Sequence, residues 1–308
     1  MKYESAAAFR EALEARLLTR SHESGVALGR LRKTVVFDRL LARLIVVAPH
    51  RWVLKGALAL DFRLGLRSRT TKDMDLGRKD GEAAATADFI AAQTLDLGDH
   101  FVFAIEKTDQ LEGLEDALAV RYHASCHLAG RRFDEVTVDV AVGESVLGKP
   151  DLLGGPSLLA FADIAPIEVP TFPLAQHIAE KLHAYGRSYG PEGRRSTRVK
   201  DLVDLVLIAR TSEIDADELG NAIRHTFKAR GRGQPPSLLL DPPAEWRPAF
   251  RRLAEEVGIS TDMGEAHRIA SALLNPILRR DEGLGRWDAA RLDWNRPGAD
   301  GGSGRSDL

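Results

Sequence analysis

The sequence predicts an α/β protein with two lobes, a mixed-sheet lobe over residues 1–150 and a helical lobe over residues 151–296. Three observations predict this class. Strand-like alternation of apolar and polar residues occurs in the first half of the chain, most clearly in VTVDVAV at 136–142. Helical spacing of apolar residues dominates after residue 174. Between these regions, residues 148–173 are rich in proline and glycine, which is typical of a boundary between domains.

The first lobe begins with apolar residues spaced three and four apart, which predict two helices within residues 1–50. A short apolar run at 51–55 predicts a strand that stops at Gly56, and ALALDFRLGL predicts a helix directly after it. A polar, basic loop follows at 67–72. The remaining expected elements of this lobe are strands at 73–77, 101–105, 119–123 and 135–142 and an alanine-rich helix at 82–93.

The second lobe shows only helical patterns, at 174–186, 199–210, 216–226, 244–257 and 264–278. The last residues, 297–308, have no apolar period and many turn formers, so we expect a disordered tail there.

The composition limits the classes of protein and of binding partner that fit this sequence. The 308 residues are 44% hydrophobic and 29% charged with a net charge of −2, which indicates a soluble globular protein and requires any nucleic-acid partner to be held by a local basic face. The single cysteine, Cys126, excludes a disulfide framework and a multi-cysteine metal centre. No apolar run reaches the roughly 18 residues of a membrane span and no leader pattern is present, so we expect a cytoplasmic protein with no membrane partner.

Three aspartates carry the most informative pattern. On a strand, Asp73 and Asp75 share one face about 7 Å apart, and Asp139 lies opposite the four valines of its own strand. Acids that face one way repel unless water or a divalent cation separates them, and oxygen-only ligands favour Mg²⁺ or Mn²⁺. The three acids therefore predict a metal site for phosphoryl transfer, whereas an isolated Asp-x-Asp is most often a solvated surface pair.

Two further features fit an anionic substrate. The turn Lys55-Gly56-Ala57 closes a strand and opens a helix, where free N–H groups can meet phosphate oxygens, although a plain glycine turn has the same sequence. Basic residues concentrate at 187–200 and 224–232, and with Arg67, Arg69 and Lys72 they predict a groove for a polyanion. Solvated loop charge is the other interpretation of these clusters.

The segment WVLKGALALDFRLGLRSRTTKDMDL resembles the signature of the AbiEii/MenT toxins, nucleotidyltransferases of the polymerase-β superfamily found in bacterial toxin–antitoxin systems. The resemblance extends in order to AEKLHAYG at 179–186 and RVKDLVDL at 198–205, and it covers roughly residues 25 to 280.

The resemblance implies a polymerase-β-like lobe with a small mixed sheet and a helical second lobe. It assigns metal binding to Asp73, Asp75 and Asp139, and further catalytic roles to Lys181 and Asp204, with Asp201 as an open alternative to Asp204. It assigns nucleotide contacts to Lys55, Gly56, Ala57, Thr71 and Lys181. Neither residue after Gly56 is Ser or Thr, so the backbone rather than a hydroxyl is expected to meet phosphate there. In some relatives the Thr71 position is phosphorylated by the antitoxin.

The function expected from this resemblance is a toxin that transfers a nucleoside monophosphate from CTP or GTP to the 3′ end of tRNA, with Mg²⁺ or Mn²⁺ as cofactor, and so blocks translation. Its expected partners are the tRNA acceptor end and a cognate antitoxin. Two alternatives stay open at this point. One is an enzyme of the same fold that modifies a small molecule or a protein, and the other is a non-enzymatic binding module in which the acids are surface charges.

Overall fold

The computed structural model describes residues 1–65, 68–108, 119–144, 146–186, 188–189, 194–195, 198–231 and 233–296. By internal contacts the chain divides into two compact units, Met1–Phe172 and Pro173–Leu308. The expected tail at 297–308 lies outside the described residues. None of the described helices is long and apolar enough to cross a membrane.

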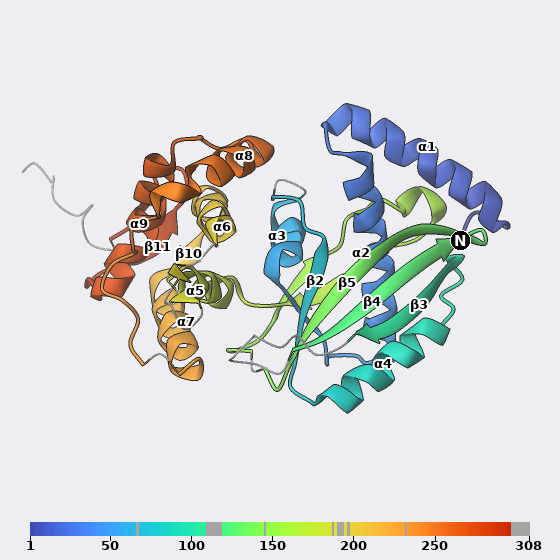
Figure 1. The fold of residues 1–308 in the computed structure, drawn as a ribbon, viewed down its shortest axis with the longest axis horizontal. Helices are drawn as coiled ribbons and strands as arrows, with labels where there is room; N and C mark the ends of the chain where they lie inside the picture. Colours follow the sequence, from blue (N-terminus) through green and yellow to red (C-terminus); the bar gives the residue numbers. More distant parts are fainter. Residues whose placement is uncertain are drawn as a thin grey trace, which may run out of the picture. The chain divides into compact units, whose positions relative to one another are not determined.

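The first unit contains a seven-stranded sheet and its helices (Figure 1). In chain order the elements are α1 (Ala6–Ser24), α2 (Leu28–Val47), β1 (Val53–Lys55), α3 (Gly56–Leu64), β2 (Asp73–Arg78), α4 (Glu82–Thr94), β3 (Phe101–Thr108), β4 (Ala119–Leu128), β5 (Arg131–Val142), β6 (Asp151–Gly154), the 3₁₀ helix η1 (Ala160–Ala162) and β7 (Glu168–Thr171).

The sheet is mixed, with strand order β3-β4-β5-β2-β1-β7-β6. The pairs β2–β5 and β1–β7 are parallel and the other pairs are antiparallel. The seam expected near residue 150 lies inside this unit, because β6 pairs with β7 and β7 pairs with the central part of the sheet. The division between the units therefore falls after Phe172, at the end of the proline- and glycine-rich stretch.

One face of the sheet is covered by helices. The valines of β5 that the alternating pattern placed together, Val136, Val138 and Val140, are at most 1% exposed, and Met74 of β2 is fully buried with them. They share a core with Leu40 of α2 and the aromatic residues of α4 and β3. Because side chains alternate along a strand, Asp73, Asp75 and Asp139 lie on the opposite face of the sheet.

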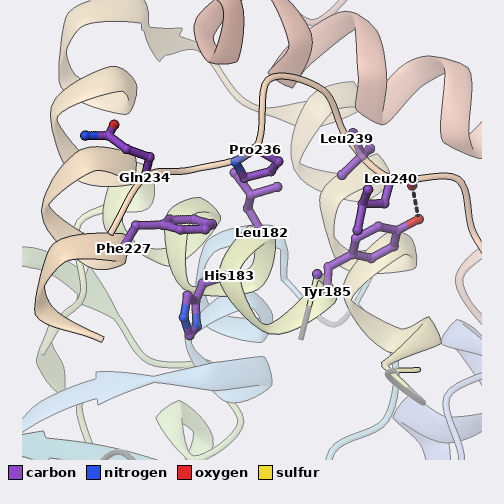
Figure 2. A pocket seen from close by; sticks show the side chains of 9 residues that line it. Leu182, His183, Tyr185, Phe227, Gln234, Pro236, Leu239 and Leu240 are labelled. Atoms are coloured by element: carbon purple, nitrogen blue, oxygen red, sulfur yellow. Dashed lines mark hydrogen bonds between the residues drawn. The ribbon is translucent and has the colours of Figure 1, made fainter. Parts of the chain in front are cut away.

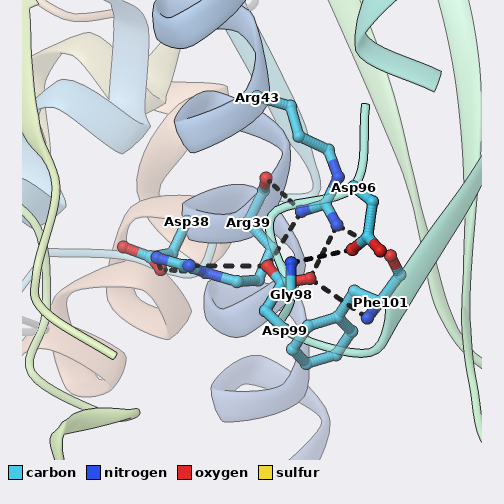
Figure 3. A network of polar contacts seen from close by, with 7 residues as sticks. All are labelled: Asp38, Arg39, Arg43, Asp96, Gly98, Asp99 and Phe101. Atoms are coloured by element: carbon cyan, nitrogen blue, oxygen red, sulfur yellow. Dashed lines mark hydrogen bonds and ion pairs between the residues drawn. The ribbon is translucent and has the colours of Figure 1, made fainter. Parts of the chain in front are cut away.

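Helix α2 also carries a buried ionic network (Figure 3). Arg43 donates to both carboxylate oxygens of Asp99, at 3.0 and 2.7 Å, and to the carbonyl oxygen of Phe101. Arg39 pairs with Asp38 at 2.5 Å and with Asp99 at 3.5 Å. The network joins α2 to the segment that leads into β3, and burial raises the pKa of Asp38 to about 6.

The second unit is mainly helical, as the sequence predicts. Its elements are α5 (Leu174–Tyr185), β8 (Ser188–Tyr189), β9 (Arg194–Arg195), α6 (Val199–Thr211), β10 (Ile214–Asp215), α7 (Ala216–Ala229), η2 (Ala244–Trp246), α8 (Arg247–Val257), α9 (Met263–Arg279), β11 (Arg286–Asp288) and β12 (Asp293–Trp294). Helix α6 lies at the centre, in contact with α5, α8 and α9.

A small three-stranded sheet, β10-β11-β12, closes this unit and was missed by the sequence analysis. Its two tryptophans are buried and hydrogen-bonded to helix carbonyls. The indole of Trp287 donates to Ala209 at 2.7 Å, and that of Trp294 donates to Leu273 at 3.0 Å. The strands are two or three residues long, too short to give a detectable period in the sequence.

Candidate functional site

A row of four charged residues crosses the centre of the sheet in the first unit. Lys55 of β1 lies opposite Asp75 of β2, Asp75 lies opposite Asp139 of β5, and Asp139 lies opposite Arg121 of β4. The row therefore places two adjacent carboxylates between two cations. Asp73 lies two residues before Asp75 on the same face and is exposed.

Asp139 is held by Arg121, a residue that the sequence analysis did not single out. The guanidinium donates to both carboxylate oxygens, from Nε at 2.7 Å and from a terminal nitrogen at 2.8 Å. Hydrogen bonding to Asp139, together with the charges of Asp139, Asp73 and Asp75, raises the pKa of Arg121. The sequence predicts a strand at 119–123, but the partner of Arg121 depends on the pairing of β4 with β5.

Gly56 brings the start of α3 against Asp75. Its φ of +66° is a left-handed conformation, and a Cβ atom at this position would lie 2.7 Å from Cγ of Asp75. Only glycine tolerates both conditions without displacing the carboxylate. The side chain of Lys55, the residue before the helix, makes no capping hydrogen bond, so it leaves the first-turn N–H groups of α3 to other acceptors.

Lys55 makes an ion pair with Glu144, the second residue that the sequence analysis missed. Its ammonium lies 2.7 Å from Oε2 of Glu144 and 5.5 Å from the centre of the Phe172 ring. The backbone N–H of Glu144 donates to the carbonyl of Arg78 at the end of β2. Glu144 follows Gly143, after the end of β5. Nothing in the local sequence indicates that its side chain lies on the same sheet face as the three aspartates.

The segment that leads into β2 is anchored by Asp61 of α3. Arg30 of α2 donates to the Asp61 carboxylate and to the carbonyl of Ser68, both at 2.7 Å, and the Ser68 hydroxyl donates to the same carboxylate at 2.5 Å. Burial raises the pKa of Asp61. Further along, the Thr71 hydroxyl donates to the carbonyl of Asp73 at 3.0 Å. These contacts fix the entry to the Asp-x-Asp strand.

The donor set of the three aspartates fits a hard divalent cation, because it consists only of carboxylate oxygens on one sheet face. Within the described ranges, no three His, Cys, Asp or Glu side chains are already spaced to hold a metal ion. One reason is the orientation of Asp139, because both of its carboxylate oxygens accept hydrogen bonds from Arg121. A bound cation would therefore share or compete for Asp139 with Arg121.

In the second unit, Lys181 and Asp204 form a buried ion pair. The Lys181 ammonium lies 2.5 Å from Asp204 and 3.7 Å from Asp201, and Asp201 also pairs with Arg198 at 2.7 Å. Both carboxylates are at most 1% exposed. The structure thus places both aspartates left open by the sequence, Asp201 and Asp204, around one ammonium, with Asp204 the closer of the two.

A cavity of about 270 Å³ lies between α5, α7 and the segment before α8 (Figure 2). Its lining is largely apolar and includes Leu182, Phe227, Pro236 and Leu239. Tyr185 donates its hydroxyl to the carbonyl of Leu240 at 2.9 Å, and burial raises the pKa of this phenol. The cavity presents hydrophobic surface rather than a set of reactive groups.

The remaining sequence candidates divide between described and undescribed positions. Cys126 is buried on β4, and His123 and His127 lie on the same strand. His123 contacts Glu135 at 3.1 Å. Arg67, Arg232 and most of the basic cluster at 187–200 lie outside the described residues, so the expected polyanion groove stays a prediction.

Comparison with known proteins gives one family match and several structural matches. The family model "Nucleotidyl transferase AbiEii toxin, Type IV TA system" matches residues 39–275. A comparison with curated proteins finds no match. Among solved structures, MenT4, a nucleotidyltransferase toxin from Mycobacterium tuberculosis, is 19% identical with a TM-score of 0.56, over 90% of this chain and 92% of that one. JHP933 from Helicobacter pylori is 13% identical with a TM-score of 0.46, over 83% and 95%.

Proposed function

Because the chain belongs to the AbiEii family of nucleotidyltransferase toxins, we propose that it transfers a nucleoside monophosphate from CTP or GTP to the 3′ end of tRNA. Addition at this end prevents aminoacylation and so blocks translation. Enzymes of this type use nucleoside triphosphates and divalent metals, and the family description indicates a toxin–antitoxin system. The cognate antitoxin is the proposed protein partner, and the cytoplasm is the proposed location.

The adjacency of Asp75 and Asp139 on parallel strands is the observation that carries this proposal. Strand pairing places the two carboxylates beside each other on one face of the sheet, and the opposite face packs into the core. The fold therefore holds the two acids close together despite their repulsion. A rigid array of acids is what binding of Mg²⁺ or Mn²⁺ requires. We assign Asp73, Asp75 and Asp139 as the metal ligands.

In the proposed reaction, an acceptor hydroxyl oxygen forms a bond to the α-phosphorus of the nucleotide. The bond between that phosphorus and the bridging oxygen of the β-phosphate breaks, pyrophosphate leaves with the electron pair, and the hydroxyl proton is released. Bound divalent cations supply charge stabilisation for the attacking oxygen and the leaving group. The first turn of α3, at Gly56 and Ala57, offers N–H groups to phosphate oxygens.

We assign supporting roles to four other residues. Lys55 contributes positive charge beside Asp75 for the triphosphate. Lys181 keeps the nucleotide contact that the family resemblance implies, and Asp204 positions its ammonium through their 2.5 Å contact. Thr71 lies two residues before the first acid, within reach of a bound nucleotide, and it is the proposed site of control by the antitoxin.

The test is incubation of the chain with each labelled nucleoside triphosphate, Mg²⁺ and total RNA. We expect label in tRNA with the native chain and its loss, by a factor of at least about 100, with Asp75→Asn. Asp241→Asn is the matched control, because Asp241 is 95% exposed and lies in the second unit. Label in the protein itself or in a small acceptor would replace the tRNA assignment, and equal labelling by Asp75→Asn and the native chain would overturn the metal assignment.

A further inference from the structure

Arg121 occupies the end of the charged row that crosses the sheet. It lies opposite Asp139, which lies opposite Asp75, so the guanidinium is one strand away from the pair of adjacent acids. Its bidentate contact uses both oxygens of Asp139, at 2.7 and 2.8 Å. The guanidinium thus stands where a positive charge is needed to offset the repulsion between neighbouring carboxylates.

The contact is strong in geometry but accessible to solvent. The side chains of Arg121 and Asp139 are 36% and 22% exposed, and ion pairs of this exposure are held weakly because water competes for both charges. Arg121 is also a long side chain anchored on β4, so it can leave Asp139 without displacing the backbone. A divalent cation that binds several carboxylates at once interacts more strongly with Asp139 than one guanidinium does.

We propose that Arg121 is a built-in counter-ion that competes with the divalent cation for Asp139. In the metal-free protein it neutralises the acidic row, and on metal loading it releases Asp139 and stays beside the site as a free cation. This inference rests on the proposed metal-binding role of the three aspartates. Competition by Arg121 makes the affinity for the divalent cation lower than three carboxylates alone would give. The cation that arrives with the nucleotide then has to displace Arg121 from Asp139.

The measurement is binding of Mn²⁺ alone, by calorimetry or by the electron paramagnetic resonance signal of the free ion. We expect Arg121→Gln to lower the Kd for Mn²⁺ by about tenfold, since it removes both the competitor and a nearby positive charge. Arg121→Lys keeps the charge but not the bidentate contact, so an intermediate Kd is expected. An unchanged or higher Kd in Arg121→Gln would overturn the proposal.

A matched arginine gives the control. Arg132 of β5 makes an ion pair with Glu135. None of its contacts that the structure describes is with Asp73, Asp75 or Asp139. We expect Arg132→Gln to leave the Kd for Mn²⁺ within about twofold of the native value. A tenfold decrease in this variant as well would show that general charge, not Arg121, sets the affinity, and would overturn the proposal.

A double-mutant cycle separates competition from simple charge repulsion. In the Asp139→Asn background Arg121 has no carboxylate to hold, so Arg121→Gln should change the Kd by less than about threefold. A full tenfold effect in that background would contradict competition at Asp139. If the folded native chain binds no Mn²⁺ at millimolar concentration, the proposed metal site itself fails, which is distinguishable from a native chain that binds Mn²⁺ but does not respond to Arg121→Gln.

Discussion

Each unit of this protein holds a cation against carboxylates, but the two arrangements differ in exposure. Arg121 and Asp139 meet on a sheet face at 36% and 22% exposure, whereas Lys181 and Asp204 meet inside a helical unit at 7% and 0%. Water weakens the first pair and makes exchange of partners easy. The second pair is buried from solvent, so a charge that loses its partner there is not solvated in compensation. The same chemistry therefore gives a weak pair at the exposed position and a strongly interdependent pair at the buried one.

The largest expected effect comes from breaking the buried pair. Lys181→Met leaves Asp201 and Asp204 buried without their shared ammonium, and we expect a loss of about 3–5 kcal/mol in the free energy of unfolding. Arg121→Gln, measured in the same way without metal, is expected to lose less than about 1 kcal/mol. Chemical denaturation checks both values.

Lys200→Met provides the control for this comparison, because Lys200 is an exposed lysine on α6. We expect its effect to stay within about 0.5 kcal/mol. Equal losses in Lys181→Met and Arg121→Gln would contradict the assignment of a structural role to the buried pair. The result also decides how loss of activity in Lys181 variants is interpreted, since an unstable unit and a missing charge give the same inactive enzyme.

A third ionic contact, at Asp38, adds a pair whose contribution to stability is expected to depend on pH. Burial raises the pKa of Asp38 from 3.8 to about 6, against the opposing effect of Arg39, while Asp99 and Arg43 complete the network. Between these pH values the folded state keeps a proton that the unfolded state releases. The contribution of Asp38 to stability is therefore largest below pH 4 and falls as the pH rises to 6.

Comparison with Asp38→Asn isolates this contribution, because asparagine does not titrate. We expect the stability of the native chain relative to Asp38→Asn to fall by at most about 3 kcal/mol between pH 4 and pH 7. Denaturation midpoints at several pH values measure the difference. A difference that is constant with pH would mean that Asp38 stays ionised, as in an exposed pair.

The last comparison tests how tightly the site around Asp75 is packed. Gly56 and Gly65 flank the same helix, α3, and both have positive φ, but only Gly56 lies against Asp75. Gly65→Ala is expected to cost about 1 kcal/mol for the backbone conformation alone. Gly56→Ala adds a clash with the carboxylate, so we expect a further loss of about 1–2 kcal/mol and loss of Mn²⁺ binding. Similar results for the two variants would show that the Asp75 side chain moves freely.

Much of the fold followed from local patterns. The alternation in β5 predicted which residues face the core, and the spacing of Asp73 and Asp75 predicted their shared face. The helices of the second unit begin within two residues of the expected positions or at them, apart from the division of 244–257 into η2 and α8. These features depend on contacts within one element, so a single sequence contains them.

Features that depend on pairing between distant elements could not be predicted in this way. The contacts of Asp139 with Arg121 and of Lys55 with Glu144 arise from strand register and from the turn after β5. The resemblance assigned Lys181 a catalytic role and a nucleotide contact, but its burial between two aspartates depends on the packing of α5 against α6. The inclusion of β6 and β7 in the first sheet likewise depends on a parallel pair with β1.

The order of the strands has a consequence for synthesis of the chain. Asp75 lies on β2, but its neighbour across the sheet, β5, is added only after α4, β3 and β4 have been made. A ribosome-bound chain that ends before β5 therefore carries Asp73 and Asp75 but lacks Asp139, the third proposed metal ligand. The proposed metal site is therefore complete only after β5 has left the ribosome and paired with β2, so the enzyme is assembled late in the synthesis of its first unit.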